Sequence, residues 1–378
     1  MRFWLFLFLF VPQIAFAGQC TPATDPEFVC SSREFDACEM DVGGITRQYC
    51  QHIPNQGGAL PAVLSFHGAG GKANALVNLW RVQTEQSMIL VVPTALETRE
   101  SGDCSLRWRQ IGTPADNWQE LNKSDPCGGG TWRSDLDFTA ALTDKLKRDF
   151  EISDFYAMGF SNGGGFIYQL YMTDELARRF SGFAVAGAGM SKKKLDASAA
   201  QTGIAGYTPN VDTLVPFLFQ MGTEDKKNIA IEEVIEAVDN NPACQPIQSA
   251  KDVMDCFGFT HLSQSVGVFD MPTRRTITRD WLVSFNNADT HRHESLYPNL
   301  GQGSEPADHT MTVREDYLEK SNEPSAAVTV LTTVDGGHDW PGWGGNRAPC
   351  PSQNCDVDLM HEIIQFWRAN GGMNLPIP

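Results

Sequence analysis

The sequence reads Phe155-Tyr156-Ala157-Met158-Gly159-Phe160-Ser161-Asn162-Gly163 from an apolar run of strand length into the glycine-rich start of a helix. A serine at the apex of a tight strand-to-helix turn takes a strained backbone conformation, and small neighbours let the two segments approach. Its hydroxyl then projects from the turn, near a helix N-terminus that favours developing negative charge. The G-x-S-x-G pattern in this context predicts that Ser161 is a nucleophile.

On both sides of this turn, apolar runs of strand length alternate with helical stretches, which predicts an α/β fold with a mostly parallel sheet and helices on both faces. Strands are expected at Ile45–Ile53, Ala62–Phe66, Met88–Pro93, Asp154–Phe160, Gly182–Ala188, Leu214–Met221 and Ala327–Val334. Helical periodicity predicts helices at Asp135–Asp149, Gly164–Arg179 and Asp356–Ala369. We expect one catalytic α/β domain over residues 45–378.

The expected strand Ala62–Phe66 runs into the glycine-rich loop His67-Gly68-Ala69-Gly70-Gly71. Backbone N–H groups can point at a substrate carbonyl oxygen only where bulky side chains are absent, so this loop is a candidate for half of an oxyanion hole. The expected donors are the amides of Ala69 and Asn162, and the alternative for the loop is a plain tight turn. The His67 side chain is assigned to substrate binding, with a structural role as its alternative.

A serine hydroxyl needs a general base. His338 is the histidine that lies in a late glycine-rich loop directly after an apolar strand. The carboxylate that orients the base is expected in the loop after the strand Leu214–Met221, where Asp225 is the first choice and Glu224 the rival. The order Ser161, Asp225, His338 along the chain is the order of an α/β-hydrolase triad.

The chain resembles the family of secreted polyhydroxybutyrate depolymerases and feruloyl esterases. The matching segments are Leu64–Gly68, Trp132–Phe138, Gly159–Gly164, Met221–Asp225 and Gly337–Gly342. The resemblance implies an α/β-hydrolase fold and an enzyme that cleaves carboxylic esters in an extracellular polymer or its fragments. It also implies that Ser161, Asp225 and His338 form the triad.

Residues 1–17 have the pattern of a secretory signal peptide: Arg2, an apolar stretch and Ala15-Phe16-Ala17. A polar, cysteine-rich lead-in over residues 18–44 follows. All ten cysteines lie beyond the cleavage point, and an even number in an exported chain favours disulfides. We expect local bridges at Cys350–Cys355, Cys244–Cys256 and Cys104–Cys127, with Cys20, Cys30, Cys38 and Cys50 pairing among themselves. Extracellular and periplasmic locations both remain open.

The formal net charge of −17 disfavours nucleic acid as a partner. After the signal peptide no stretch is apolar enough for a membrane anchor. We expect a monomer that binds an ester substrate, polymeric ones included. No cofactor and no metal are expected, because the group His291, His293, Glu294 and His309 fits no established metal site and is interpreted as a solvated polar loop.

Five tryptophans are candidates for an aromatic platform under a polymer or a phenolic ring. Trp340 is favoured because it lies two positions after His338, and the others are Trp108, Trp118, Trp132 and Trp343. Residues 227–325, between the acid and histidine loops, are less regular. They are interpreted as an insertion that either caps the site or elaborates the surface.

Two other functions are compatible with these motifs. A serine peptidase would use the same triad on amides. A catalytically silent hydrolase fold would act as an extracellular binding module, but such proteins usually lack a triad residue, and all three are present here.

Overall fold

The computed structural model describes residues 20–55, 57–80, 88–100, 103–110, 126–128, 130–131, 133–190, 210, 212–223, 225, 274–297, 310–320, 325–342 and 357–372. Within them, an 11-stranded sheet runs in the order β1-β2-β3-β5-β4-β8-β9-β10-β13-β12-β11. Its strands are β1 (Thr21–Pro22), β2 (Asp36–Val42), β3 (Ile45–His52), β4 (Leu60–Phe66), β5 (Ile89–Pro93), β8 (Ile152–Phe160), β9 (Gly182–Ala186), β10 (Phe217–Gly222), β11 (Ala288–Tyr297), β12 (Met311–Glu319) and β13 (Val328–Val334). A separate hairpin pairs β6 (Glu97–Glu100) with β7 (Asp103–Leu106).

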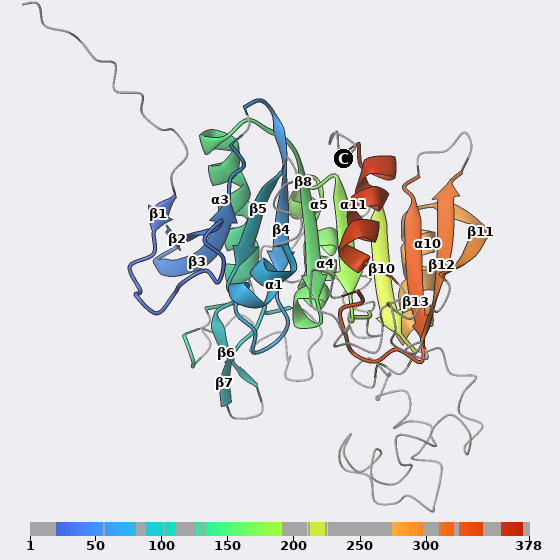
Figure 1. Cartoon of the computed structure of the whole chain (residues 1–378), viewed down its shortest axis with the longest axis horizontal. Coiled ribbons are helices and arrows are strands. Elements are labelled where there is room, and N and C mark those ends of the chain that lie inside the picture. Colours follow the sequence, from blue (N-terminus) through green and yellow to red (C-terminus); the bar gives the residue numbers. More distant parts are fainter. Residues whose placement is uncertain are drawn as a thin grey trace, which may run out of the picture.

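The middle of the sheet, from β5 through β4, β8, β9 and β10 to β13, is parallel. The strands at both ends pair antiparallel. The predicted parallel pairing is therefore confirmed for the centre of the sheet, whereas the sheet as a whole is mixed, because five of its ten strand pairings are antiparallel. Parallel pairing brings the carboxyl ends of β4, β8, β10 and β13 to one edge, from which the β6–β7 hairpin projects at the bottom of Figure 1.

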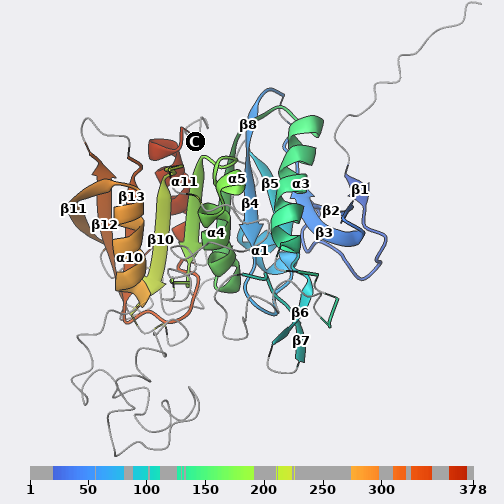
Figure 2. The same ribbon diagram turned by 180° about the vertical axis from the view of Figure 1, so that it is seen from behind.

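Helices cover both faces of the sheet, as expected. They are α1 (Ala73–Trp80), α3 (Ser134–Asp149), α4 (Asn162–Met172), α5 (Asp174–Ala177), α10 (Arg274–Phe285) and α11 (Leu359–Asn370). Figure 1 shows α1 and α11 on the near face, and Figure 2 shows α3, α4 and α10 on the opposite one. Each face has its own buried apolar cluster, one including Phe166 of α4 and the other including Trp367 of α11.

The predicted helix Gly164–Arg179 is wrong in its continuity. Thr173 has φ −98° and ψ 111°, an extended conformation that separates α4 from α5. Its hydroxyl donates to the carbonyl oxygen of Gln169, and the amide of Asn210 donates to that of Met172. These partners satisfy carbonyls at the end of α4, so the chain can leave the helix without a buried unpaired group.

The described part of the expected insertion is regular, contrary to the prediction. β12 pairs antiparallel with β13, and β11 pairs with β12, so this region extends the sheet. Residues 227–273 lie outside the described part, and a cap formed there stays a prediction. The lead-in likewise joins the sheet, because β2 pairs with β3 along its whole length.

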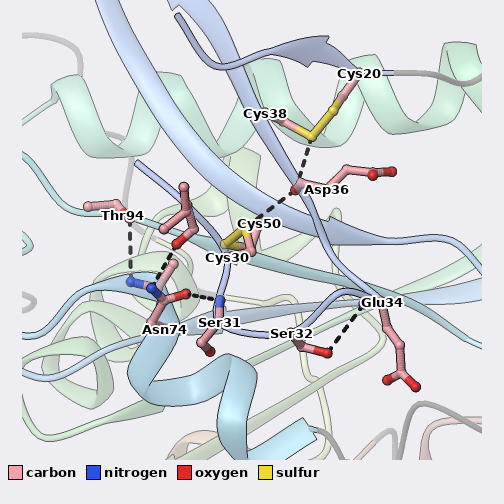
Figure 3. Close-up of a disulfide and its surroundings, with 12 residues drawn as sticks. Cys20, Cys30, Ser31, Ser32, Glu34, Asp36, Cys38, Cys50, Asn74 and Thr94 are labelled. Carbon is pink, nitrogen blue, oxygen red and sulfur yellow. Dashed lines mark hydrogen bonds between the residues drawn. A yellow bond between two sulfur atoms is a disulfide. The ribbon is translucent and has the colours of Figure 1, made fainter. Parts of the chain in front are cut away.

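Three disulfides lie in the described part of the chain. Cys20–Cys38 and Cys30–Cys50 tie the lead-in to β2 and β3 (Figure 3), and Cys104–Cys127 joins strand β7 to residue 127. The Cys104–Cys127 pairing and the grouping of the other four are confirmed. The remaining expected bridges, Cys244–Cys256 and Cys350–Cys355, are outside the described residues, as is the predicted signal peptide. Of the helices described, none has the length and apolar character needed to cross a bilayer.

Candidate active site

Ser161 lies at the turn between β8 and α4, with φ 53° and ψ −118°. Such a conformation is costly for a residue other than glycine and persists only where the surroundings enforce it. The neighbouring glycines explain how it is enforced. A Cβ on Gly163 would lie 2.1 Å from the carbonyl oxygen of Phe66, and one on Gly159 would lie 2.4 Å from the carbonyl carbon of Gly163. The turn can therefore form only with glycine at both positions, and Ser161 lies at its apex.

His338 follows β13, and its ring connects the serine to the acid. Its Nε2 lies 2.8 Å from Oγ of Ser161, and its Nδ1 lies 2.9 Å from each carboxylate oxygen of Asp225. The three side chains form a Ser-His-Asp triad. Because an ionised carboxylate can only accept, Nδ1 carries the hydrogen and Nε2 is left to accept from the serine hydroxyl. This is the tautomer that a general base needs.

Asp225 is held in the loop after β10, and its side chain is 1% exposed. Two bonds join this loop to the end of β13 and to the histidine loop: the amide of Thr223 donates to the carbonyl oxygen of Thr333, and the amide of Asp335 donates to the Thr223 hydroxyl at 2.8 Å. The rival acid, Glu224, lies outside the described residues.

The ring of His338 packs against Phe160, with 5.2 Å between the ring centroids. Gly187, with φ +59°, lies against both rings: a Cβ there would be 2.9 Å from the Phe160 ring and 3.3 Å from Cε1 of His338. Trp340 also packs against Phe160, edge-on with 6.1 Å between the ring centroids, and is 6% exposed. The indole is buried in the core, and its predicted substrate contact stays a prediction.

The loop after β4 lies beside the nucleophile. A Cβ on Gly68 would be 3.3 Å from Cβ of Ser161, and the next residue of the loop, Ala69, is exposed. Asn162 is the first residue of α4, where backbone N–H groups have no partner within the helix. Within the described part of the chain, no acceptor is found for the amides of Ala69 and Asn162. The two predicted oxyanion donors thus belong to segments that flank Ser161, and their role is part of the proposal below.

His67 is fully buried, and both ring nitrogens are engaged. Nε2 accepts from the amide of Ala95 at 3.0 Å, so Nδ1 carries the hydrogen and donates to the carbonyl oxygen of Gly68 at 2.7 Å. Burial lowers the pKa of His67 to about 4. Both ring nitrogens are bonded within the protein and the side chain is buried, so this geometry favours the structural alternative, in which the neutral ring holds the loop in place.

Trp108 is also unavailable as a platform, because it is 1% exposed. Its indole packs on Phe66 and Phe166 and donates to the carbonyl oxygen of His67 at 2.9 Å. Trp118, Trp132 and Trp343 lie outside the described residues.

The sequence did not reveal the side-chain role of Asn162 or the buried pair Arg47–Asp135. The residues next to Asn162, Arg47 and Asp135 in the sequence do not indicate which distant residues these side chains contact.

Of the group considered for metal binding, the described part of the chain includes the side chains of His293 and Glu294. His293 and Glu294 are exposed, and they lie on β11 rather than in the polar loop that was predicted. His309 is outside the described residues. Among the described residues, no three His, Cys, Asp or Glu side chains are grouped so that they could hold a metal ion.

No family model matches the chain, and no curated protein matches it in sequence. Solved structures that resemble it include a thermostable esterase at 15% identity and a TM-score of 0.35, covering 66% of this chain and 63% of the esterase. A cold-adapted esterase from an Arctic intertidal metagenomic library has 14% identity and a TM-score of 0.34, covering 54% of this chain and 77% of that one. The 2,6-dihydroxy-pseudo-oxynicotine hydrolase has 16% identity and a TM-score of 0.33, covering 55% and 58%. This chain thus spans less than two thirds of the thermostable esterase, and similarity at this level assigns it no activity.

Proposed function

We propose that this protein is a secreted serine hydrolase of the α/β-hydrolase type that cleaves carboxylic esters through an acyl-enzyme. One observation carries the proposal: Nε2 of His338 lies 2.8 Å from Oγ of Ser161 while Nδ1 is held by Asp225. These contacts join residues 177 and 113 positions apart in the chain. If Ser161, Asp225 and His338 had only a structural role, the serine would not need a strained backbone conformation at the apex of a turn between two glycines.

In the proposed first step, Oγ of Ser161 attacks the ester carbonyl carbon while Nε2 of His338 takes the hydroxyl proton. The amides of Ala69 and Asn162 bind the resulting oxyanion. The intermediate collapses when the carbon–oxygen bond to the alcohol breaks, and the imidazolium returns its proton to the departing alkoxide. Water then attacks the acyl-enzyme with the same base, releasing the acid and restoring Ser161.

Asp225 keeps its charge and stabilises the imidazolium. Its buried position favours this role, because a carboxylate shielded from water interacts more strongly with the positive ring. No metal or cofactor has a part in these steps.

The substrate class follows from the resemblance: esters of an extracellular polymer or its fragments, of the hydroxybutyrate, feruloyl or acetyl type. The disulfides support an oxidising compartment, either extracellular or periplasmic. We propose that the protein acts as a monomer.

The test is hydrolysis of a p-nitrophenyl acyl ester by the wild type and by Ser161→Ala, combined with labelling by a fluorophosphonate probe. We expect turnover and labelling at Ser161 in the wild type, and neither in the variant at an unchanged melting temperature. Unchanged hydrolysis by a folded Ser161→Ala protein would refute the assignment. An inert wild type would favour the binding module, and turnover of peptides but not esters would favour the peptidase. A panel of hydroxyalkanoate, feruloyl and acetyl esters then ranks the substrates.

A further inference from the structure

The bridging segment, Leu106–Gln110, lies between the loop after β4 and the first turn of α4. On the side of the loop, the carbonyl oxygen of Leu106 accepts from the amide of Gly70 at 2.8 Å. The indole Nε1 of Trp108 donates to the carbonyl oxygen of His67 at 2.9 Å. These two bonds fix both ends of the stretch that contains Ala69.

On the side of the helix, the side-chain amide of Asn162 makes two bonds to the backbone of Trp108. Its Oδ1 accepts from the Trp108 amide at 2.7 Å, and its Nδ2 donates to the Trp108 carbonyl oxygen at 3.2 Å. Nε2 of Gln110 donates to the carbonyl oxygen of Asn162 at 3.3 Å. A Cβ on Gly165 would lie 2.1 Å from Oε1 of Gln110, so this glycine lets the helix approach the segment.

The bridging segment is anchored by a buried ion pair. The amide of Arg109 donates to Oδ2 of Asp135 at 2.8 Å, while Oδ1 of the same carboxylate pairs with Arg47 at 2.7 Å. The Arg47 and Asp135 side chains are each 1% exposed. An acceptor fixed by a buried charged partner cannot move without leaving that charge unpaired.

We propose that the Trp108 indole and the Asn162 side chain are positioning groups that set the separation of the two oxyanion donors through the bridging segment. The inference rests on the proposed hydrolase function. Oxyanion donors stabilise the transition state only if they are already in place, and displacement of a reacting group by about 1 Å can reduce the rate about a hundredfold. No covalent bond fixes the distance between two backbone amides that belong to separate segments of the chain. Hydrogen bonds through the bridging segment do fix it.

Two single variants test the two sides independently. Asn162→Ala removes both bonds to the backbone of Trp108, and Trp108→Phe removes the bond to His67 while keeping an aromatic ring. In each we expect kcat for p-nitrophenyl acetate to fall about tenfold to a hundredfold, with KM changed less than about threefold. The affinity for a trifluoromethyl ketone should fall by the same factor as kcat, because its tetrahedral adduct needs the same donors.

Asn210→Ala is the matched control. Asn210 is also buried, and its amide also bonds to backbone, accepting from Thr213 at 2.9 Å and donating to Tyr171 at 2.9 Å, but it lies at the far end of α4. This variant should lower the melting temperature and leave kcat and inhibitor affinity at wild-type values.

A folded Asn162→Ala or Trp108→Phe protein with wild-type kcat and wild-type ketone affinity would overturn the role assigned to that side chain. If one variant does not fold, the other still decides. Failure of the proposed function looks different: the wild type itself, or Ser161→Ala, would then violate the expectations for ester turnover.

Discussion

Gly222 and Gly336 approach so closely that a Cβ on Gly222 would lie 2.1 Å from the carbonyl oxygen of Gly336. Gly222 ends β10, and Gly336 follows β13, its parallel neighbour. The acid loop and the histidine loop begin at these two glycines, so this approach sets how far Asp225 lies from His338.

Gly222→Ala should therefore reduce activity and stability together. The added methyl group meets backbone rather than a flexible side chain, so we expect a loss at or above the upper end of the ~1–3 kcal/mol usual for overpacking. The kcat for a p-nitrophenyl ester should fall strongly in the fraction that remains folded. Both quantities are measured by urea unfolding and ester hydrolysis. Gly57→Ala is the control, because a Cβ there meets nothing within 4 Å; equal effects of the two variants would contradict the explanation.

Asp225→Asn should lower kcat about 10²- to 10⁴-fold with a much smaller change in KM. An amide leaves the ring without the charge that stabilises the imidazolium and no longer enforces the required tautomer. Steady-state kinetics on a p-nitrophenyl ester measure this. Asp335→Asn, three residues before His338, makes the same chemical change without a bond to the ring and should retain activity. The assignment of Asp225 fails if these two results are reversed.

His67 predicts a pH dependence of stability. Its pKa is lowered from 6.5 to about 4 by burial in the folded protein, so between these values the unfolded chain binds a proton that the folded chain does not. The free energy of unfolding should thus rise with pH from about 4 to 6.5, with roughly 3 kcal/mol from this residue, and be fully present above 6.5.

The measurement is urea unfolding of the wild type and of His67→Gln between pH 4 and 7. Carboxylates contribute a slope of the same sign in both proteins, so the difference between the two slopes isolates the histidine. Identical slopes would show that His67 is not buried as a neutral ring.

Breaking the buried pair Arg47–Asp135 should be costly. Burial lowers the pKa of Arg47, and the charge of Asp135 opposes this shift. Asp135→Ala leaves the guanidinium uncompensated and should reduce the free energy of unfolding by about 3–5 kcal/mol. The double variant Arg47→Met with Asp135→Leu removes both charges and should recover part of that loss. An unfolding free energy for the double variant below that of the single one would contradict this account.

The local patterns of the chain predicted much of the parallel sheet. Apolar runs such as Ala62–Phe66 and Ala327–Val334 became β4 and β13 almost unchanged, because parallel strands buried on both faces are largely apolar along their length. β11 was missed for the opposite reason. It is the last strand of the sheet, residues 293–296 are exposed, and its sequence has no such run.

The continuity of helices was also beyond the sequence pattern. The residues from α4 through α5 keep helical periodicity, and the break at Thr173 depends on Asn210, which is distant in the chain. The side-chain role of Trp108 was lost in the same way. Aromatic residues near a site suit a platform or a core equally well, and only burial separates the two.

The sequence by itself determined the strand-to-helix turn at Ser161 and the order of serine, acid and histidine, because glycine spacing and apolar runs act over a few residues. Tertiary structure alone decided that the side chains of His67 and Trp340 are buried in the core. It also decided that Asn162 is held by Trp108 and that Arg109 is anchored through Asp135. Contacts between residues that are dozens of positions apart depend on which strands become neighbours in the sheet. The order of the strands depends on the whole chain and not on a local pattern.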